Sequence, residues 1–401
     1  MRPWLSLIGI GEDGIEALSP AAKRLIAGAE LVVGGKRHLA LAGQFPGEPL
    51  PWPSPLADAF PTILERRGHP VAVLASGDPF FHGVGATLAR KVDPDEMICL
   101  PAPSAFSLAA ARLGWAQQDC ALISLHGHAL ERIIPHLQPK ARILALSWDE
   151  TTPQKLAALL TSRRMGGSQL VVCEAMGGPR ERLTRMRADA FAPAPIHALN
   201  TVGIEIVAEP GADIVPLASG LPDEMFEHDG QITKRDIRAA TLAALAPRLG
   251  ETLWDVGAGS GSIGIEWMLR HRQNHAVAIE AKPERAARIA RNAAILGVPH
   301  LAIVEGEAPA ALAGLPQPDA VFIGGGASRG GVLDIAWNAL SQGGRLVVNA
   351  VTLETQAELI RRYESLGGEL VTLQIAVAEP LGGFHKFRPA LPVMRWTAVK
   401  R

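Results

Sequence analysis

The stretch WDVGAGSGSIGIE, residues 254–266, decides the fold of the second half of the chain. An apolar run ends at an acidic residue, three closely spaced glycines follow, and a second apolar run begins at Ile263. This order predicts a strand, a tight turn and the start of a helix, as in doubly wound sheets. Two glycine patterns overlap here, G-x-G-x-G from Gly257 and G-x-G-x-x-G from Gly259, and the second is the dinucleotide fingerprint. The ligand of the turn therefore has to be inferred from the residues around it.

Asp255 lies just before the glycines, at the end of the predicted strand. A carboxylate there would face the like charge of a pyrophosphate. S-adenosylmethionine (SAM) has no phosphate, and its methionine end carries a cationic ammonium and a cationic sulfonium. Asp255 therefore favours SAM over NAD. Glu280 ends the next predicted strand and can accept hydrogen bonds from ribose hydroxyls, which both ligands offer, so it does not discriminate between them.

The rest of this half alternates apolar runs with helical stretches, which predicts a doubly wound sheet. Residues 233–250 are expected to form its first helix, with Thr233 as N-cap. The tail differs, because 368–380 and 385–400 are consecutive strand-like segments with no convincing helix between them. They predict an antiparallel hairpin at the far edge of the sheet, whereas an ordinary NAD-binding sheet is parallel throughout.

With Asp255, the glycine turn and the terminal hairpin, the second half resembles the class I methyltransferases. The resemblance implies that SAM binds here and that Glu307, after the third strand, meets the adenine, although Asp is common at that position. The alternative for Glu307 is a solvated loop acid. The residues expected at SAM in this half are Thr233, Asp255, Gly257, Ala258, Gly259, Ser260, Gly261, Glu280, Glu307 and Ala308.

The first half contains five short motifs: LIGIGEDG (7–14), ASGDPFFHG (75–83), PAPSAFSL (101–108), SLHGH (124–128) and EAMGGPRERL (174–183). Together they resemble the tetrapyrrole methylases, the class III methyltransferases, over roughly residues 3–210. The resemblance implies two α/β lobes with SAM folded into the cleft between them. Where many members have Pro-Gly-Asp after the second glycine, this chain has Glu-Asp-Gly, which leaves the fine shape of that loop open.

Residue by residue, this resemblance places SAM against the glycine-rich loops of the first half. Each glycine also has a purely local explanation, because tight strand-to-helix turns need glycine, and Asp78 before Pro79 could simply form an Asx-turn. The residues expected at SAM here are Gly9, Gly11, Ser76, Gly77, Asp78, Ser104, Ala105, Met176 and Gly177.

Residues 208–230 are rich in proline, glycine and acids and have no sustained period, so they suit a linker. We therefore expect a class III domain at 1–210, a linker at 211–228 and a class I domain at 229–401. This fusion resembles the bifunctional methyltransferases of cobalamin biosynthesis, on the signature DGQITKRDIRA (229–239) together with FIGGG (322–326) and NAVTLET (349–355). The resemblance implies methylation of precorrin-6Y at C5 by the first domain. It implies methylation at C15, with loss of the ring C acetate at C12, by the second, giving precorrin-8X.

Methyl transfer to such a substrate requires no covalent nucleophile from the protein. A meso carbon of a reduced tetrapyrrole is an enamine carbon and already nucleophilic, so alignment with the methyl group and exclusion of water supply most of the rate. No catalytic residue and no metal is assigned. For the decarboxylation, His385, Glu266 and Glu354 are conceivable helpers, but ordinary surface or packing roles are favoured for all three.

The substrate carries many carboxylates, which basic side chains can clamp. Arg329, directly after GGGAS at the end of a predicted strand, is the strongest candidate, and Arg37 and His82 are further possibilities near the first site. The residues expected to bind substrate are Arg329, Lys234, Arg235, Lys386, Arg388 and His126.

Composition limits the competing functions. With 39 basic and 40 acidic residues among 401, the net charge of −1 and the lack of a basic, aromatic-rich stripe argue against a methyltransferase acting on RNA. An NAD-linked reductase is disfavoured by Asp255 and the tail, and two complete pockets would be excessive for a SAM-sensing module. Another polyanionic tetrapyrrole remains an alternative substrate.

The three cysteines have no C-x-x-C spacing and predict neither disulfides nor a zinc site. Glycines and acids interrupt the first apolar run, so we do not expect the N-terminus to act as a signal peptide, and no apolar run reaches the roughly 18 residues that a membrane span needs. We expect a cytoplasmic enzyme with a small-molecule substrate and without a membrane or nucleic-acid partner. The class I resemblance implies a homo-oligomer, with a tetramer favoured.

Overall fold

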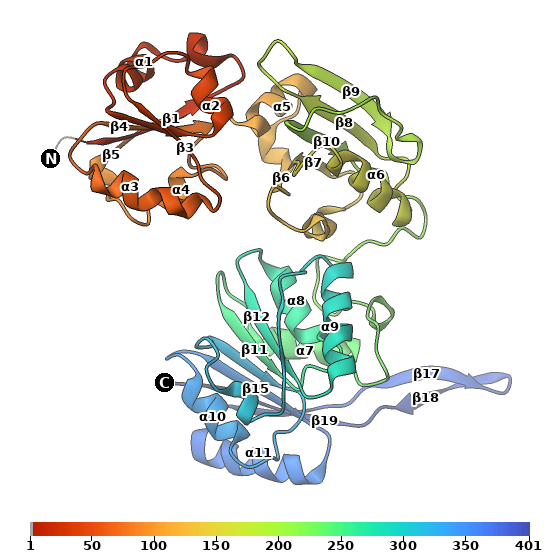
Figure 1. Ribbon diagram of the computed structural model, residues 1–401. Helices are drawn as coiled ribbons and strands as arrows, with labels where there is room; N and C mark the ends of the chain where they lie inside the picture. Colours follow the sequence, from red (N-terminus) through yellow and green to blue (C-terminus); the bar gives the residue numbers. More distant parts are fainter. Residues whose placement is uncertain (1–2) are drawn as a thin grey trace. The chain divides into compact units, whose positions relative to one another are not determined.

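The computed structural model describes residues 3–401 and divides them into two compact units (Figure 1). The first unit contains the residues up to Leu130 and His136–Asp213, and the second contains Glu131–Pro135 and Ile214–Arg401. The segment 211–228, expected as a linker, is therefore divided at Asp213. Its larger part packs into the second unit, where Leu221 and Phe226 are buried. This packing was not predicted, because a segment without a periodic pattern of apolar residues can still be held in place by a few buried ones.

The first lobe of the first unit is a parallel sheet with strand order β3-β2-β4-β1-β5. Ser19 caps α1, since its hydroxyl oxygen accepts from the Ala22 N–H at 3.2 Å. Apolar clusters lie on both faces of the sheet. The elements are β1 (Leu5–Ile10), α1 (Pro20–Ala27), β2 (Leu31–Gly34), α2 (Lys36–Leu41), β3 (Glu48–Pro51), α3 (Phe60–Glu65), β4 (Val71–Ser76), α4 (Gly85–Leu88) and β5 (Met97–Leu100).

The second lobe has a mixed sheet of order β6-β7-β10-β8-β9, in which only β6 and β7 are parallel. Its elements are α5 (Ala105–Leu113), β6 (Cys120–Ser124), β7 (Arg142–Leu146), α6 (Thr152–Ser162), β8 (Gln169–Glu174), β9 (Arg182–Arg187) and β10 (Asn200–Glu205). Two α/β lobes in the first half confirm the predicted architecture of this half.

The second unit contains a seven-stranded sheet of order β13-β12-β11-β14-β15-β19-β16, with its core around Trp254, Val321 and Trp396. The first five strands are parallel, and β19 runs antiparallel to both of its neighbours. This confirms the doubly wound sheet and its antiparallel strand. The elements are α7 (Arg235–Leu245), β11 (Thr252–Val256), α8 (Ser262–Arg270), β12 (His275–Glu280), α9 (Pro283–Ile295), β13 (Ala302–Glu305), β14 (Ala320–Ile323), α10 (Val332–Ala339), β15 (Arg345–Ala350), α11 (Leu353–Leu366), β16 (Glu369–Leu373) and β19 (Val393–Val399).

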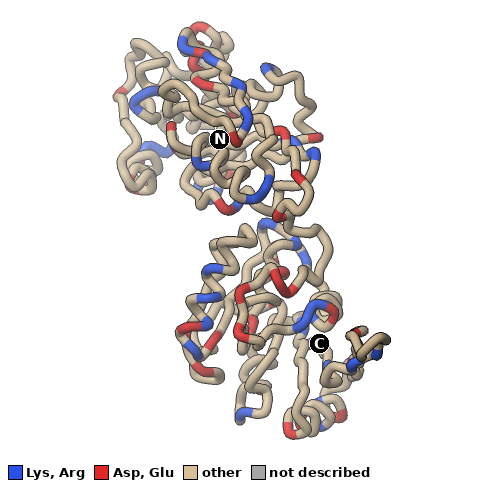
Figure 2. Tube along the Cα trace, turned by 90° about the vertical axis from the view of Figure 1, so that its right-hand side faces the viewer, with Lys and Arg blue, Asp and Glu red and all other residues tan. Residues whose placement is uncertain are grey.

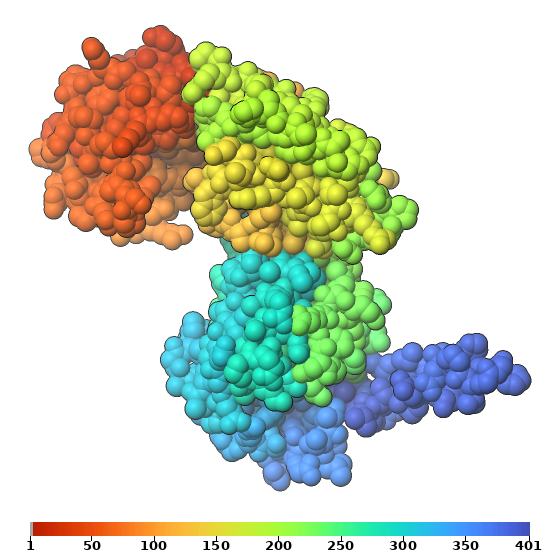
Figure 3. Space-filling model, turned by 45° about the vertical axis from the view of Figure 1, so that its right-hand side comes forward, coloured from red at the N-terminus to blue at the C-terminus, as the bar shows by residue number. Residues whose placement is uncertain are grey.

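The tail forms four strands, not the two that were expected. Between β16 and β19 the chain makes a separate antiparallel hairpin, β17 (Ala376–Leu381) and β18 (Phe384–Pro389), which projects from the body of the second unit (Figures 1 and 3). The two residues between these strands, Gly382 and Gly383, are a favoured pair for a two-residue hairpin turn. The sequence expectation overlooked this signal and merged adjacent strands.

The start of α7 also differs from expectation. Lys234, one residue after Thr233, is the N-cap, and its side chain makes no capping hydrogen bond. The carbonyl oxygen of Thr233 instead accepts a hydrogen bond from the Arg238 guanidinium. Thr233 is therefore held by the buried Arg238 side chain and does not cap the helix itself. A capping pattern in the sequence does not predict this interaction.

Candidate functional site

In the first unit, three loops make direct backbone contact where β1 and β4 end. The Ala102 N–H donates to the Gly77 carbonyl oxygen at 3.1 Å. A Cβ atom on Gly9 would overlap that same oxygen and the Ala102 nitrogen, so only glycine fits there. Gly77 has a φ of +57°, and a Cβ on it would lie 2.9 Å from the Cα of Ser104. The loops at 9–14, 76–79 and 101–104 thus form one continuous surface.

A loop of the second lobe lies against this surface. A Cβ atom on Gly178 would be 2.7 Å from the Cβ of Glu12, and the Arg180 guanidinium lies 3.8 Å from the Glu12 carboxylate. Gly177 and Met176 come directly before this contact. The structure therefore brings together the loops that carry all nine residues expected at SAM in this half.

Several of the side chains in these loops are already engaged. The Ser104 hydroxyl oxygen accepts from the Ser107 N–H at 3.1 Å and caps α5. The Asp78 carboxylate accepts from the Phe80 N–H at 2.8 Å, which is the Asx-turn that was the local alternative for this residue. Met176 is buried in the core of the second lobe. A ligand in this region would therefore meet chiefly main-chain groups.

A polar cluster beside Ser76 was only partly foreseen. The Arg37 guanidinium donates to the Ser76 hydroxyl at 2.9 Å and forms an ion pair with Glu12, and His38 Nε2 lies 2.8 Å from the same hydroxyl. Burial and the neighbouring Arg37 lower the pKa of His38 to about 4, so its ring is neutral at pH 7. A signal was present in the sequence, because Lys-Arg-His follows β2 at the carboxyl edge of a parallel sheet.

The two histidines considered for this unit lie among aromatic rings. His126 follows β6, and its ring centroid is 6.3 Å from that of Trp148, on the second lobe. His82 has a φ of +57° and its ring lies 5.1 Å from the Phe81 ring and 5.9 Å from the Phe106 ring.

In the second unit, the glycine turn has the backbone that only glycine adopts readily. Gly257, Gly259 and Gly261 have φ values of +71°, +61° and +77°. A Cβ atom on Gly259 would lie 3.1 Å from the carbonyl oxygen of Gln231, and one on Gly257 would lie 3.0 Å from the nitrogen of Gly325. The signature segment before α7, the glycine turn and the GGG loop after β14 therefore meet at the carboxyl edge of the sheet.

Glu280 closes this turn from the neighbouring strand. Its carboxylate accepts from the Gly259 N–H at 2.8 Å and from the Lys282 N–H at 3.0 Å, and the residue is 5% exposed. Glu280 thus lies where the sequence predicts contact with ribose hydroxyls, and both of its carboxylate oxygens accept hydrogen bonds from main-chain N–H groups.

Asp255 is almost fully buried beneath the turn. One carboxylate oxygen accepts from the Gly264 N–H at 2.9 Å, in the first turn of α8. Burial and, to a lesser extent, the charge of Glu280 raise the pKa of Asp255 to about 7, against the effect of the Gly264 hydrogen bond. A cationic neighbour would stabilise its charged form.

Two buried polar atoms beside the turn have no hydrogen-bond partner within residues 3–401: Oδ1 of Asp255 and Oγ of Ser260. Buried polar atoms are rarely left unpaired, and an unpaired one calls for a specific explanation. An acceptor carboxylate and a hydroxyl suit the ammonium and polar end of a methionine tail. The residues of this turn therefore fit SAM.

Glu307 and Arg329, expected at cofactor and substrate respectively, form an ion pair with each other, and each side chain is about half exposed. Arg329 also lines a cavity of about 380 Å³ between the loop after β14 and the start of α11, which Glu354 borders as well. Ala308 lines a second cavity, of about 420 Å³, together with Glu307. Both cavities follow strands that end at the same sheet edge as the glycine turn, the edge where doubly wound sheets bind ligands.

The other basic candidates contact acids or carbonyls of the chain itself. Lys234 lies 3.6 Å from the Asp223 carboxylate, and Arg235 donates to the Gly220 carbonyl at 3.0 Å. Lys386 and Arg388 extend from β18 to Glu379 on β17, at 3.3 and 3.1 Å. The structure does not bring these last two residues to the glycine turn.

Among the conceivable decarboxylation helpers, Glu266 is fully enclosed. It is 0% exposed, and its oxygens accept from the Leu221 N–H, the Gly220 N–H and the Arg238 guanidinium. These contacts give Glu266 a structural role between α8, Arg238 and the segment at Gly220. His385 lies on the exposed strand β18, and Glu354 borders the cavity at Arg329.

Within residues 3–401, no helix combines the length and the apolar character that a membrane span requires. The same residues contain no group of three or more His, Cys, Asp or Glu side chains that could hold a metal ion.

Comparison with known proteins covers both units. Residues 5–192 match the family described as Tetrapyrrole (Corrin/Porphyrin) Methylases, and residues 224–400 match the Precorrin methyltransferase domain. A Sinorhizobium protein named precorrin-6Y C(5,15)-methyltransferase (decarboxylating) is 57% identical over 100% of this chain and 97% of its own length. The Mycobacterium tuberculosis protein of the same name is 42% identical over 98% of this chain and 99% of its own.

Among solved structures, the C-terminal domain of precorrin-6Y C5,15-methyltransferase from Rhodobacter capsulatus is 45% identical, with a TM-score of 0.45. It covers 46% of this chain and 100% of its own. The likeness to the two full-length relatives extends over nearly the whole chain.

Proposed function

Because the chain belongs to the precorrin-6Y C5,15-methyltransferases (decarboxylating), we propose that it transfers two methyl groups from SAM to precorrin-6Y, at C5 and C15, and removes one carboxyl group. It is a SAM-dependent C-methyltransferase of cobalamin biosynthesis. The observation that carries the proposal is the full-length likeness at 57% identity. We further propose loss of the C12 acetate carboxyl and precorrin-8X as the product.

We assign C5 methylation to the first unit and C15 methylation with decarboxylation to the second. Two separate glycine-lined loop clusters support one SAM molecule in each unit. In the first, the close approach of Gly9, Gly77 and Ala102 supports a cofactor held by the main chain. In the second, the turn at Gly257, the acid at Glu280 and the unpaired oxygen of Asp255 support a cofactor held by its ribose and methionine ends.

When bound, SAM supplies an electrophilic methyl group on a sulfonium. The residues of the chain then have to orient and dehydrate the two reacting carbons, since the meso carbon is itself the nucleophile. In the second unit, Asp255 would hold the ammonium of the methionine tail, and Glu280 the ribose hydroxyls. The substrate would enter along the cavity at Arg329, whose guanidinium would exchange Glu307 for a substrate carboxylate.

The charge pattern supports a small anionic substrate over RNA. Figure 2 shows Lys and Arg interspersed with Asp and Glu along the trace, and the total charge is −1. RNA-binding surfaces normally gather basic residues in a patch or stripe.

Parallel incubations of the full chain and SAM labelled with ¹³C in its methyl group, with precorrin-6Y, with another polyanionic tetrapyrrole or with RNA, test the proposal. With precorrin-6Y we expect two ¹³C-methyl signals in the product and one equivalent of CO₂. Label in RNA without label in tetrapyrrole would overturn the proposal, and turnover of a different tetrapyrrole alone would restrict it to the alternative substrate.

We also propose that the chain is a homo-oligomer, with a tetramer favoured, and that the β17–β18 hairpin supports the assembly. An isolated two-stranded hairpin is marginally stable in water at best. This one exposes Phe384 and Phe387 by 79% and 75%, together with Val377 and Leu381, on strands that are otherwise unsupported. Exposed apolar groups of this kind commonly mark a protein contact surface.

Replacing Phe384 and Phe387 together by serine is therefore expected to lower the molar mass measured by light scattering towards that of one chain. The melting temperature of each unit is expected to change little, because both rings are exposed in the single chain. Leu249→Ser, at a 67% exposed position elsewhere in the second unit, is the matched control. An unchanged molar mass would remove the hairpin from the interface.

A further inference from the structure

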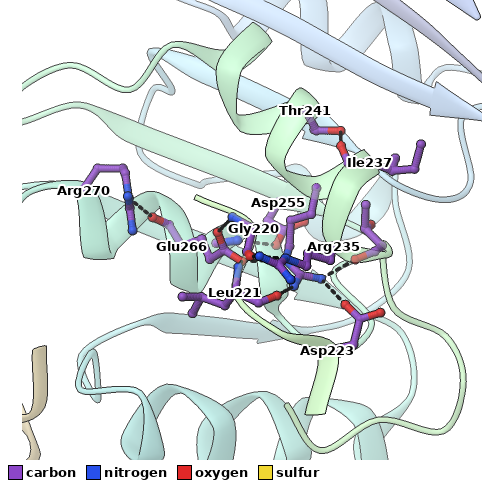
Figure 4. Close-up of polar contacts among 12 residues, drawn as sticks. Gly220, Leu221, Asp223, Arg235, Ile237, Thr241, Asp255, Glu266 and Arg270 are labelled. Atoms are coloured by element: carbon purple, nitrogen blue, oxygen red, sulfur yellow. Dashed lines mark hydrogen bonds and ion pairs between the residues drawn. The ribbon is translucent and has the colours of Figure 1, made fainter. Parts of the chain in front are cut away.

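A buried arginine, Arg238, lies in the second turn of α7 and is 0% exposed. Its Nε donates to the Glu266 carboxylate at 2.6 Å, and its Nη1 lies 3.0 Å from the Asp223 carboxylate. Nη1 also donates to the carbonyl oxygen of Thr233, and Nη2 donates to the carbonyl oxygen of Leu221. Figure 4 shows three of the residues that these contacts involve, Leu221, Asp223 and Glu266, close together beside Gly220.

The partner carboxylate, Glu266, is equally enclosed. Besides Arg238 it accepts from the Leu221 N–H at 3.0 Å and the Gly220 N–H at 2.7 Å. The positive charge of Arg238 therefore lies against the negative charge of Glu266, and both carboxylate oxygens of Glu266 accept hydrogen bonds from the chain itself. Burying two charges is costly even when they are paired, so replacing such a pair by apolar side chains is often neutral or stabilising. Stability alone does not account for this arrangement.

Arg238 contacts two segments that border the proposed cofactor site, the signature segment and helix α8. Thr233 is part of the segment whose Gln231 carbonyl approaches Gly259 of the glycine turn. Glu266 is on α8, which begins directly after Gly261 of the same turn. One guanidinium thus joins the main chain of the signature segment to the helix that follows the turn.

We propose that Arg238 is a positioning residue for the second unit's SAM site: by holding the Thr233 carbonyl and Glu266 together, it sets the separation between the signature segment and the glycine turn. This inference rests on the proposed function, because it takes the turn to be where SAM binds. Arg238 itself touches no ligand and acts through Thr233. Displacement of the signature segment at Thr233 would weaken SAM binding at the second unit and leave the first unit's site unaffected.

The test compares single and paired replacements in the full chain. Arg238→Met alone leaves a buried, unpaired carboxylate and is expected to destabilise the second unit. Arg238→Met with Glu266→Met removes both charges and is expected to restore folding without restoring the bond to Thr233. Arg238→Lys, which keeps the charge but has no planar fork to reach several oxygens, serves if the paired variant does not fold.

A second buried pair in the same unit provides the matched control. Arg345 bonds Glu251 at 2.6 Å and donates to the carbonyls of Leu245 and Ala246. It holds the far end of α7, and it is the first residue of β15, at the sheet edge opposite to the glycine turn. Arg345→Met with Glu251→Met therefore removes a similar pair from the same helix without touching Thr233.

The readout is KM for SAM in the formation of each ¹³C-methyl group, alongside thermal unfolding. For folded Arg238→Met/Glu266→Met we expect KM for SAM at C15 to rise about tenfold, with KM at C5 unchanged. The Arg345 and Glu251 control is expected to keep both values. A wild-type KM at C15 in the folded paired variant or in Arg238→Lys would overturn the inference. Absence of C15 methylation by the wild-type chain would instead reject the proposed function.

Discussion

Replacing Gly9 by alanine is expected to abolish C5 methylation, by about 100-fold or more, while C15 methylation and decarboxylation continue. The added Cβ would overlap the Gly77 carbonyl oxygen and the Ala102 nitrogen. Both are backbone atoms, which cannot move aside as a flexible side chain can, so the three-loop surface has to open. A product with one ¹³C-methyl group, at C15, and one CO₂ released is the expected result.

The control for this variant is Gly167→Ala in the same unit. The nearest atom to a Cβ there is a side-chain methyl of Val207, at an ordinary contact distance of 3.4 Å. We expect this chain to make both methyl groups at wild-type rates. Full C5 methylation by the Gly9→Ala chain would mean that the surface beside Gly9 is not the C5 site. Loss of both methyl groups, with both units folded, would contradict two independent sites.

The glycine loops and the architecture of both units were predictable because their signals are local. A strand, a glycine turn and a helix start follow one another within 254–266, and the three glycines of that turn adopt left-handed φ values. The antiparallel β19 was foreseen because no helix separates the last apolar segments. The position of β19 between β15 and β16 was not predicted, because strand order within a sheet depends on pairing between distant segments.

What the sequence did not reveal depends on contacts between distant residues. Glu12, Arg37 and Ser76 lie far apart in the chain, yet they form one cluster because β1, β2 and β4 end at the same edge of a parallel sheet. The substrate candidates Lys234 and Arg235 looked free for the same reason. Their partners, Asp223 and Gly220, are in a segment that the sequence suggested to be a linker.

At Asp255 the structure shows an environment that the sequence did not predict. From the sequence, its carboxylate is expected to repel a pyrophosphate, whereas burial in the structure raises the pKa of Asp255 to about 7. Since the pKa in the folded state lies above the ordinary value of 3.8, the folded chain binds the proton more tightly than the unfolded chain does. Without SAM, the stability of the second unit is therefore expected to fall as pH rises from about 4 to about 7.

Binding of a cationic methionine tail beside Asp255 reverses this preference. The ammonium stabilises the carboxylate, so binding is expected to release a proton near pH 7, and KM for SAM at C15 is expected to fall as pH rises through that value. Asp255→Asn keeps an acceptor for the Gly264 N–H but has no charge to offer. We expect it to raise KM for SAM at C15 by about tenfold or more and to make that KM independent of pH.

Calorimetric titration of SAM in two buffers of different ionisation enthalpy measures the proton release directly. The difference between the wild-type chain and Asp255→Asn isolates the second unit, because the first unit contributes equally to both. Ser260→Ala is the matched control: its hydroxyl is also buried and unpaired among the described residues, but it does not titrate. Equal proton release by the wild type and Asp255→Asn would show that Asp255 does not pair with the cofactor. In that case its buried carboxyl group would serve only to hold the first turn of α8 through Gly264.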